Sequence, residues 1–307
     1  MKSFSVALPE GIWYMLSANL FFSFMTVSVY GVKILDPSVS PFVVSFVRVI
    51  VNFLVILLPV IVFGKRKLLF GDRRASLWFR GLFGGIALML FFYSIQTLGP
   101  SESTFIQSAN GIFIVLLCPL VLSERFSVRA LLAVLGAVLG LYILFDPSFS
   151  GGRTIGQIMA LVSGVFAALS ALMVAKSGKS NSYVTVVFYF CFVAVFVHLA
   201  YFAVAGDVVI PKGYLVWVAM IGVGIFSSAA QLLMTKAYQI APASVVVAVG
   251  YSGPVLNTVW GIVLFGQMLT IRAMVGCFII LLCGVFLPFL KKELKTDCPV
   301  VDIKEGM

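Results

Sequence analysis

The chain has 307 residues, of which 62% are hydrophobic and only 10% are charged, with a formal net charge of +10 and a mean hydropathy of +1.14. Soluble domains carry about 25% charged residues, so this composition excludes a water-soluble enzyme, a secreted disulfide scaffold and a coiled coil. A spanning helix needs about 20 apolar residues, which leaves room for about ten helices and no soluble domain. A β-barrel is also excluded, because barrel strands alternate apolar and polar residues, whereas runs such as 53–63 and 130–145 are apolar on every face.

Proline, glycine and charged residues divide the chain into ten apolar segments. The predicted spans are 11–31, 41–63, 77–98, 101–122, 127–145, 154–175, 182–205, 214–237, 242–265 and 270–290. The first segment is too long for the core of a cleaved signal peptide, which has about 7–15 apolar residues. We therefore expect an all-α integral membrane protein with ten transmembrane helices, a short N-terminal segment over 1–10 and a charged tail over 291–307.

Lysines and arginines are distributed unevenly between the two sides of the predicted spans. If the N-terminus is cytoplasmic, most of them fall inside, including a cluster formed by Lys65, Arg66, Lys67, Arg73, Arg74 and Arg80. Those that do not are Lys33, Arg153, Lys212 and Arg272, which fall outside, and Arg48, which lies within the second span. This asymmetry predicts a multi-pass protein of the plasma membrane, in bacteria the inner membrane, with both termini in the cytoplasm. Anionic lipid headgroups then explain the net charge, and no nucleic-acid partner is needed.

The two halves of the chain resemble each other. Residues 123–130 (SERFSVRA) match residues 266–273 (GQMLTIRA), and Leu98-Gly99-Pro100 matches Ile240-Ala241-Pro242, in both cases at nearly the same spacing. Five helices per half is an odd number, so the second copy must enter the membrane upside down, as in many secondary transporters. We expect the repeats to cover residues 11–145 and 146–290.

The segment over 98–144 combines a small-residue entry, a break within the span, a Ser-Glu-Arg turn and a closing Gly-rich helix. It resembles the repeat unit of the drug/metabolite transporter superfamily, EamA type, and the segment over 240–286 is similar to it. Two departures are Gln267, where the motif usually has a glutamate, and Asn110-Gly111, where Ser-Pro is more usual.

The resemblance implies a central cavity between two inverted five-helix halves and the transport of a small polar metabolite by alternating access. The substrate class it leaves open includes amino acid-like and nucleoside-containing metabolites such as S-adenosylmethionine, moved inward or outward. Small residues at four-residue spacing, for example Gly81 with Gly85, predict close helix packing and are compatible with a homodimer.

Arg48 stands about eight residues into the second span, with no carboxylate at a matching depth in any span. A guanidinium at membrane depth costs about 2.5–3.5 kcal/mol on insertion scales, so a compensating interaction is expected. One interpretation is that Arg48 reaches outward or ties backbone carbonyls together. The other is that Arg48, with Asn52 one turn further along, supplies a fixed positive charge for an anionic or zwitterionic substrate.

Polar side chains recur at helical spacing in other spans. Such residues often join membrane helices, but their spread over several spans also fits the lining of a substrate cavity. With Arg48, the predicted substrate-binding residues are Asn19, Tyr93, Gln96, Gln107, Asn110, Gln231 and Tyr251.

The fourth and ninth spans are each interrupted near their midpoints, by Asn110-Gly111 and by Ser252-Gly253-Pro254. Proline removes a helical hydrogen bond, and freed carbonyls at membrane depth need protein or cavity water to satisfy them. Matched breaks in two repeats point to a binding site, so Gly111, Gly253 and Pro254 are predicted gating residues. The alternative for either break alone is a simple kink.

Catalytic and metal chemistry find little support in the sequence. His198 is the only histidine, and it is expected to form a hydrogen bond between helices; the five cysteines include no CxxC pair. We therefore predict no catalytic residue, no metal and no cofactor. The rival functions are an integral-membrane enzyme that modifies lipids, which would need titratable groups gathered at one interface, and a non-transporting membrane scaffold.

Overall fold

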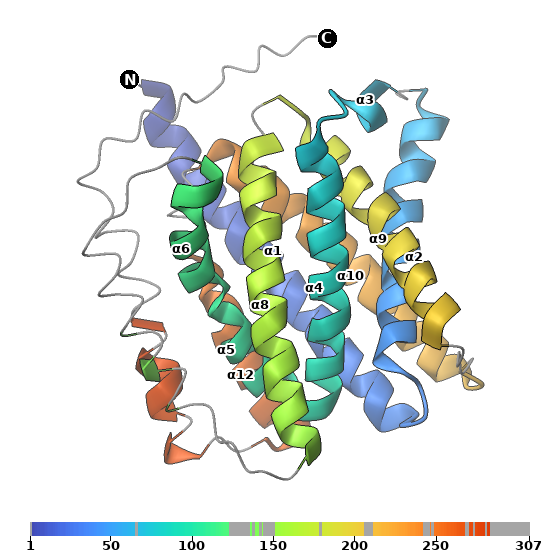
Figure 1. Cartoon of the computed structure of the whole chain (residues 1–307), viewed down its shortest axis with the longest axis vertical. Coiled ribbons are helices and arrows are strands. Elements are labelled where there is room, and N and C mark those ends of the chain that lie inside the picture. Colours follow the sequence, from blue (N-terminus) through green and yellow to red (C-terminus); the bar gives the residue numbers. More distant parts are fainter. Residues whose placement is uncertain are drawn as a thin grey trace.

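The computed structural model describes residues 2–64, 67–122, 136, 139–140, 143, 151–177, 180–205, 211–241, 246, 249–267, 270–272, 274–279 and 281–282. The elements within these residues are helices that pack side by side into a bundle (Figure 1). They are α1 (Lys2–Leu35), α2 (Pro41–Val62), α3 (Lys67–Phe70), α4 (Ala75–Leu98), α5 (Pro100–Ser108), α6 (Asn110–Leu122), α8 (Gly151–Ser177), α9 (Tyr183–Ala205), α10 (Tyr214–Ile240) and α12 (Ser252–Phe265).

Six of the described helices, namely α1, α2, α4, α8, α9 and α10, are long and apolar enough to cross a membrane. Their bounds agree with the predicted spans to within a few residues, except that α1 begins at Lys2 instead of residue 11. The fourth predicted span consists of two helices, α5 and α6, and the short helix α3 was not predicted. Most of the fifth and tenth predicted spans lies outside the described residues.

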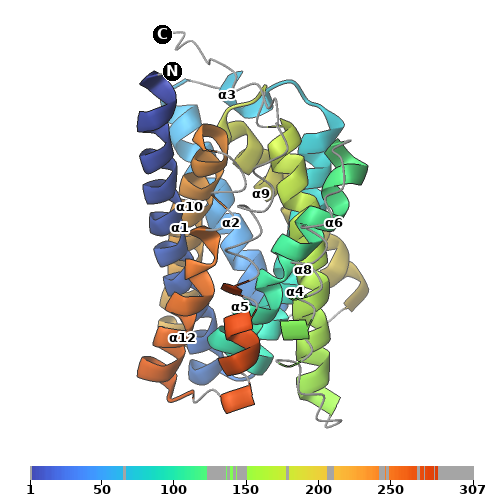
Figure 2. The ribbon, with the colours of Figure 1, turned by 90° about the vertical axis from the view of Figure 1, so that its left-hand side faces the viewer.

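The bundle is built from two copies of one helix arrangement in opposite orientations. In Figure 1, α1 descends from the N-terminus at the top of the view, whereas α8, its counterpart in the second half, ascends. The helix pairs show the same correspondence between the halves. α1 packs along α10 and α4 packs along α8, so in both cases the first spanning helix of one half lies against the third spanning helix of the other (Figures 1 and 2). Contacts of α2 with α10 and of α9 with α4 are related in the same way. The predicted all-α membrane fold with two inverted repeats is confirmed.

Helix ends follow the local sequence. The Ser40 hydroxyl caps α2 by accepting a hydrogen bond from the backbone N–H of Phe42, and Pro41 occupies the first turn, where no intrahelical donor is needed. Gly99 ends α4 with a φ of 87°, a left-handed conformation that favours glycine, and Pro100 then starts α5. The Leu98-Gly99-Pro100 motif thus turns the chain back into the membrane.

Two glycines of α4 allow close packing against α9. A Cβ on Gly81 would lie 2.5 Å from the Cβ of Val193 and 2.8 Å from the carbonyl oxygen of Tyr189, and one on Gly85 would lie 3.2 Å from the Cα of Ala194. Membrane helices gain stability from such close approach, since lipid offers no hydrophobic driving force between them. This small-residue seam therefore lies inside the protomer.

The Gly81 contact leads to a stability prediction. We expect Gly81→Ala to destabilise the protein by about 1–3 kcal/mol, because the added methyl group meets Val193 and the α9 backbone. Gly31→Ala is a matched control, since nothing lies within 4 Å of a Cβ built there. Thermal unfolding of the purified variants should show a lower melting temperature only for Gly81→Ala; equal values for both would contradict the tight seam.

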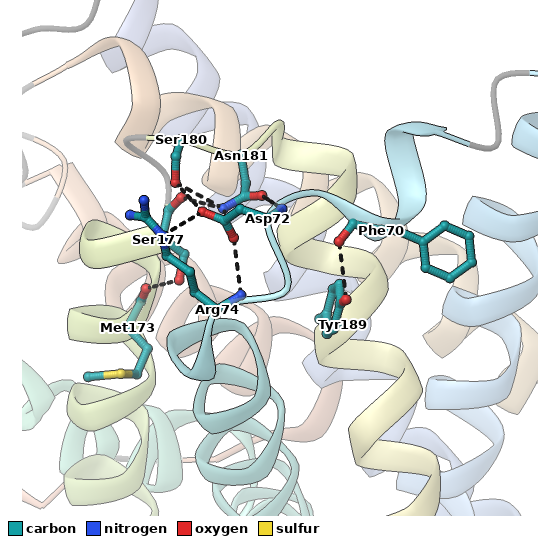
Figure 3. Close-up of polar contacts among 8 residues, drawn as sticks. All are labelled: Phe70, Asp72, Arg74, Met173, Ser177, Ser180, Asn181 and Tyr189. Atoms are coloured by element: carbon teal, nitrogen blue, oxygen red, sulfur yellow. Dashed lines mark hydrogen bonds and ion pairs between the residues drawn. The ribbon is translucent and has the colours of Figure 1, made fainter.

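A polar cluster joins the two halves at the end of the bundle where α3 lies (Figure 3). Asp72, in the loop between α3 and α4, accepts hydrogen bonds from the Ser180 hydroxyl (2.6 Å) and the Asn181 amide (2.9 Å). The Asp72 backbone N–H donates to Asn181 Oδ1 (2.9 Å), and Gln239 of α10 donates to the Asn181 carbonyl oxygen (3.0 Å).

A second polar cluster joins α5 to α8 at the other end of the bundle. Glu102 of α5 accepts hydrogen bonds from Arg153 (2.8 Å) and Gln157 (2.7 Å) of α8.

The Asp72 cluster makes stability depend on pH. Partial burial alone raises the pKa of Asp72, but the hydrogen bonds from Ser180 and Asn181 and the charge of Arg74 hold that pKa below its ordinary value. A carboxyl with a depressed pKa stabilises the fold above its unfolded pKa of about 3.9, and this contribution is lost as the pH falls through the folded-state pKa.

We therefore expect the melting temperature of the wild type to fall more steeply between about pH 5 and pH 3 than that of Asp72→Asn. At neutral pH the variant should be the less stable of the two. Asp36→Asn is the control, because Ser38, in the same turn, is the one described residue whose hydrogen bonds the Asp36 carboxylate accepts. Identical pH profiles for wild type and Asp72→Asn would show that the cluster does not act through this charge.

Candidate functional site

Arg48 lies in α2 with only 4% of its surface exposed. Its guanidinium carbon lies 5.5 Å from the centroid of the Phe92 ring of α4, and its Nε has no hydrogen-bond partner. No ion pair joins it to a carboxylate among the residues that the structure describes. The side chain is buried, and among the described residues its guanidinium group donates no hydrogen bond to a carbonyl oxygen, so the Phe92 ring face is the compensation that these residues show for its charge.

A second buried arginine lies in α4. Arg80, which the lysine and arginine distribution places on the cytoplasmic side with the basic residues of the preceding loop, lies inside this helix with 6% of its surface exposed. Arg80 Nη1 donates to the Ser170 hydroxyl of α8, and its guanidinium carbon lies 4.5 Å from the centroid of the Phe190 ring. Its Nε has no hydrogen-bond partner among the described residues.

Amide and hydroxyl groups occupy the α2 and α10 surfaces next to these arginines. The Asn52 amide, one turn along α2 from Arg48, lies 2.7 Å from the Ser227 hydroxyl and 2.8 Å from that of Ser228. Gln231 follows one turn later on the same face of α10, buried, with its Nε2 unpaired. We call Arg48, Asn52, Arg80, Ser227, Ser228 and Gln231 the arginine cluster.

His198 of α9 borders the arginine cluster. Its Nε2 lies 2.8 Å from the Ser45 hydroxyl of α2, and its Nδ1 lies 2.7 Å from the Ala194 carbonyl oxygen. If Nδ1 carries the proton, that nitrogen donates to Ala194 and Nε2 accepts from Ser45. The predicted hydrogen bond between helices is confirmed.

Two further predicted substrate-binding residues, Gln96 and Tyr93, lie in α4 near Phe92, the ring that Arg48 contacts. Gln96 lies one turn beyond Phe92, the ring over which Arg48 stacks, and its Nε2 is buried and unpaired. Tyr93 instead packs against Phe42, with 6.1 Å between the ring centroids.

The first predicted break lies between α5 and α6, at Ala109. Gln107, in the last turn of α5, donates to the Ser163 hydroxyl of α8 (3.1 Å), while Ser163 donates to the Ala87 carbonyl oxygen (2.7 Å). Asn110 and Gly111 form the first turn of α6. Ser163 of α8 therefore links the end of α5, next to the break, to the backbone of α4.

The second predicted break lies just before α12, at the turn formed by Tyr251, which is buried. Asn19 of α1 donates to the carbonyl oxygens of Val249 (3.0 Å) and Gly250 (3.3 Å) and to the Ser252 hydroxyl (2.8 Å). Gly253 and Pro254 are buried in the first turn of α12, where proline sacrifices no helical hydrogen bond. Asn19 thus satisfies carbonyls that the break sets free.

The predicted substrate-binding residues therefore separate into groups. Arg48 and Gln231 belong to the arginine cluster and Gln96 lies next to Phe92, whereas the other predicted residues support the two helix breaks or, for Tyr93, pack against an aromatic ring. Sequence reasoning missed Arg80, Ser227 and Ser228. The available signals were that the predicted span 77–98 already contains Arg80 and that both serines precede Gln231 by one helical turn.

Comparisons with known proteins agree with this architecture. The EamA-like transporter family matches residues 9–146 and 154–289. An uncharacterised transporter of Helicobacter pylori is 29% identical over 296 residues, covering 93% of this chain and 97% of its own. The pseudopaline exporter CntI of Pseudomonas aeruginosa is 25% identical over 213 residues, covering 69% of this chain and 74% of its own.

A protein of known crystal structure has the same fold, with a TM-score of 0.65 and 18% sequence identity, over 94% of this chain and all of that protein. The resemblance seen in the sequence is thus confirmed in both halves. The chain belongs to the EamA-like transporter family of the drug/metabolite transporter superfamily and is a multi-pass membrane transporter of a small molecule, not an enzyme.

Proposed function

We propose that this transporter carries a small polar metabolite with an anionic group, which binds at the arginine cluster during alternating access between the two halves. The observation that carries the proposal is the pair of buried guanidinium groups, Arg48 and Arg80, without a carboxylate partner among the described residues. An uncompensated buried charge is costly, so an anionic ligand is the natural counter-charge.

The distribution of acidic residues supports an anionic substrate. A carboxylate at membrane depth is the usual partner of a cationic substrate, but ten of the 11 acidic residues in the sequence lie outside the predicted spans, and Glu102 lies at the start of one. The acidic residues are Glu10, Asp36, Asp72, Glu102, Glu124, Asp146, Asp207, Glu293, Asp297, Asp302 and Glu305. Metabolites with a net positive charge, such as S-adenosylmethionine, fit this site less well than anions or amino acid-like zwitterions that present a carboxylate.

The unpaired atoms of the arginine cluster point to the same chemistry. Arg48 Nε, Arg80 Nε and Gln231 Nε2 are all hydrogen-bond donors that lack acceptors in the part of the chain that the structure describes. Buried donors are normally satisfied, so a ligand rich in acceptor oxygens complements them. Carboxylates and phosphates have such oxygens and pair with arginine in a planar, bidentate way.

The proposal is tested by ligand-induced stabilisation of the purified protein, followed by uptake into liposomes. Ligands that bind the folded state raise its melting temperature, so anionic and zwitterionic metabolites should stabilise the protein and cationic metabolites should not. Hits should then be taken up by liposomes that contain the protein and not by empty ones. Stabilisation and uptake of cations alone would contradict the proposal.

For the topology we propose the plasma membrane, with both termini, the loop over 65–74 and the tail over 291–307 in the cytoplasm. In a cysteine-free background, cysteines placed at Arg73 and Lys212 should then label from opposite sides. Both positions are exposed; Arg73 follows Asp72, whereas Lys212 precedes the start of α10, and it is the other end of α10, at Gln239, that contacts the Asp72 cluster. An impermeant thiol reagent added to intact cells should label only the Lys212 position. Labelling of both positions from outside would contradict this orientation.

A further inference from the structure

His198 is a buried titratable group to which the proposed function gives no task. It is the only histidine of the chain, and 0% of its surface is exposed. Building on the proposed function, we propose that His198 binds a proton together with an anion at Arg48, so that substrate and proton move in the same direction. An anionic substrate alone does not specify what drives its transport, whereas this pair of sites does.

The hydrogen bonds of His198 accommodate both protonation states. Its Nδ1 lies 2.7 Å from the Ala194 carbonyl oxygen, which can only accept, so Nδ1 carries a hydrogen in either state. Its Nε2 lies 2.8 Å from the Ser45 hydroxyl, which itself lies 3.0 Å from the Phe42 carbonyl oxygen. Ser45 donates to Nε2 when the imidazole is neutral. When Nε2 binds a proton, it donates to Ser45, whose hydrogen turns to Phe42, so the imidazole keeps both hydrogen bonds.

The Arg48 side chain runs along α2 toward the turn that holds His198. Arg48 follows Ser45 by three residues, so the two side chains share one face of the helix. Long side chains in a helix point back toward its N-terminus, which directs Arg48 toward Ser45. The distance of 5.5 Å between its guanidinium carbon and the centroid of the Phe92 ring of α4 fits this direction.

The aromatic contacts of Phe42 place Phe92 and His198 at the same level of the bundle. Phe42, in the first turn of α2, packs against Tyr93, the residue after Phe92, with 6.1 Å between the ring centroids. It also packs against Tyr201, three residues after His198, with 4.4 Å between the centroids. The guanidinium group over Phe92 and the imidazole therefore lie next to the same turn of α2.

No carboxylate of the described helices around α9 offsets a proton on His198. The helices that pack against α9 are α2, α3, α4 and α10, and their charged residues are Arg48, Lys67, Arg80 and Lys236. The other titratable groups of these helices and of α9 are phenols and a thiol, mostly uncharged at neutral pH. They are Tyr93, Tyr183, Tyr189, Cys191, Tyr201, Tyr214 and Tyr238. A proton on His198 therefore adds a second positive charge, on which that of Arg48 acts.

This charge couples the proton to the anion. While no anion is bound, the positive charge of Arg48 disfavours a protonated imidazole. An anion at Arg48 removes this repulsion, so each ligand raises the affinity of the protein for the other by the same factor. Alternating access then moves anion and proton together, and a proton gradient drives the anion toward the less acidic side.

The first experiment needs no ligand. Because His198 is the only histidine, ¹⁵N-labelled histidine gives one imidazole whose protonation is read by NMR, in protein purified with a tag that contains no histidine. We expect Arg48→Gln to bind the proton at least about tenfold more tightly than the wild type, since the repelling charge is gone. Arg73→Gln, in an exposed loop, is the matched control and should titrate like the wild type. Equal titration of wild type and Arg48→Gln would overturn the proposal.

Ser45→Ala tests the hydrogen bond that holds the proton. It removes the acceptor for the Nε2 hydrogen, and an unpaired charged donor costs more than an unpaired neutral acceptor. We therefore expect its affinity for the proton to fall by about tenfold or more. Ser28→Ala is the matched control, because the Ser28 hydroxyl donates to the Phe24 carbonyl oxygen in its own helix. The same titration in both serine variants would contradict a proton site built on Ser45.

The same NMR titration with anions measures the coupling. The probes are trifluoroacetate and sulfate at about 10 mM, which keep a constant charge over the titration and represent a carboxylate and a phosphate. A probe that raises the melting temperature of the wild type is bound. Such a probe should raise the affinity of His198 for the proton by about fivefold or more, and it should leave Arg48→Gln unchanged. Binding without this change would overturn the coupling and leave an anionic substrate in place.

Transport separates this inference from the proposed function. Labelled succinate, lactate and inorganic phosphate are offered to liposomes that contain the protein and to empty ones, with and without acid outside. Wild-type uptake should be about fivefold or more faster with the gradient. In His198→Gln the gradient should not change it. Wild-type uptake that ignores the gradient would overturn proton coupling alone, whereas uptake of cations and of none of these anions would overturn the proposed function as well.

Discussion

Arg48→Ala is expected to lose nearly all substrate binding, by about 100-fold or more, while the protein remains folded. Truncating one partner of a buried, hydrogen-bonded charge pair costs about 2–5 kcal/mol of binding. Removing an uncompensated buried guanidinium should leave the melting temperature of the substrate-free protein unchanged or higher. Arg48→Lys keeps the charge but loses the planar fork, so it should weaken binding and retain some activity.

Affinity and thermal stability measured on the same purified variants decide between the two roles of Arg48. An arginine that holds helices together would give an unstable or poorly inserted alanine variant, whose folded fraction binds substrate normally. Unchanged affinity in a well-folded Arg48→Ala protein would end the charge-recognition hypothesis for this residue.

The helix breaks are the second place where large effects are expected. Gly111→Leu and Pro254→Ala should each slow transport by about tenfold or more, with a much smaller change in melting temperature, because conformational steps set many turnover rates. The leucine adds bulk at the first turn of α6, and the alanine allows the helix to run through into α12. Transport into liposomes and thermal unfolding are measured on the same preparations.

Pro59→Ala is the matched control for the second variant, since Pro59 lies within α2 and away from both breaks. It should transport at the wild-type rate. If Gly111→Leu and Pro254→Ala insert normally and also transport at that rate, the breaks are kinks without a gating role.

The spans could be predicted because backbone groups in lipid must be satisfied within a helix, which forces long apolar runs with polar ends. The same rule concealed Arg80. It lies five residues after the start of α4 at Ala75, next to a basic loop, and its long side chain could equally have reached the headgroups. Only the packing of α4 against α8 and α9 shows that it is buried beside Ser170 and Phe190.

Asn19 shows a different limit of sequence reasoning. An amide in a membrane helix fits a cavity lining and a helix contact equally well, and its partners here are 230 to 233 residues away in the chain. Its role at the break before α12 follows only from the way the inverted halves bring α1 against α12. Ser227 and Ser228 are similar, since serines are common between membrane helices and gain meaning only from their contact with Asn52.

The decisive measurement is the uptake of a labelled anionic substrate by liposomes that contain the Arg48→Ala/Arg80→Ala double variant. We expect saturable uptake for the wild type and only background uptake for the double variant, with a comparable amount of folded protein in both membranes. Uptake by the folded double variant at the wild-type rate and affinity would contradict recognition of the substrate by the two buried arginines.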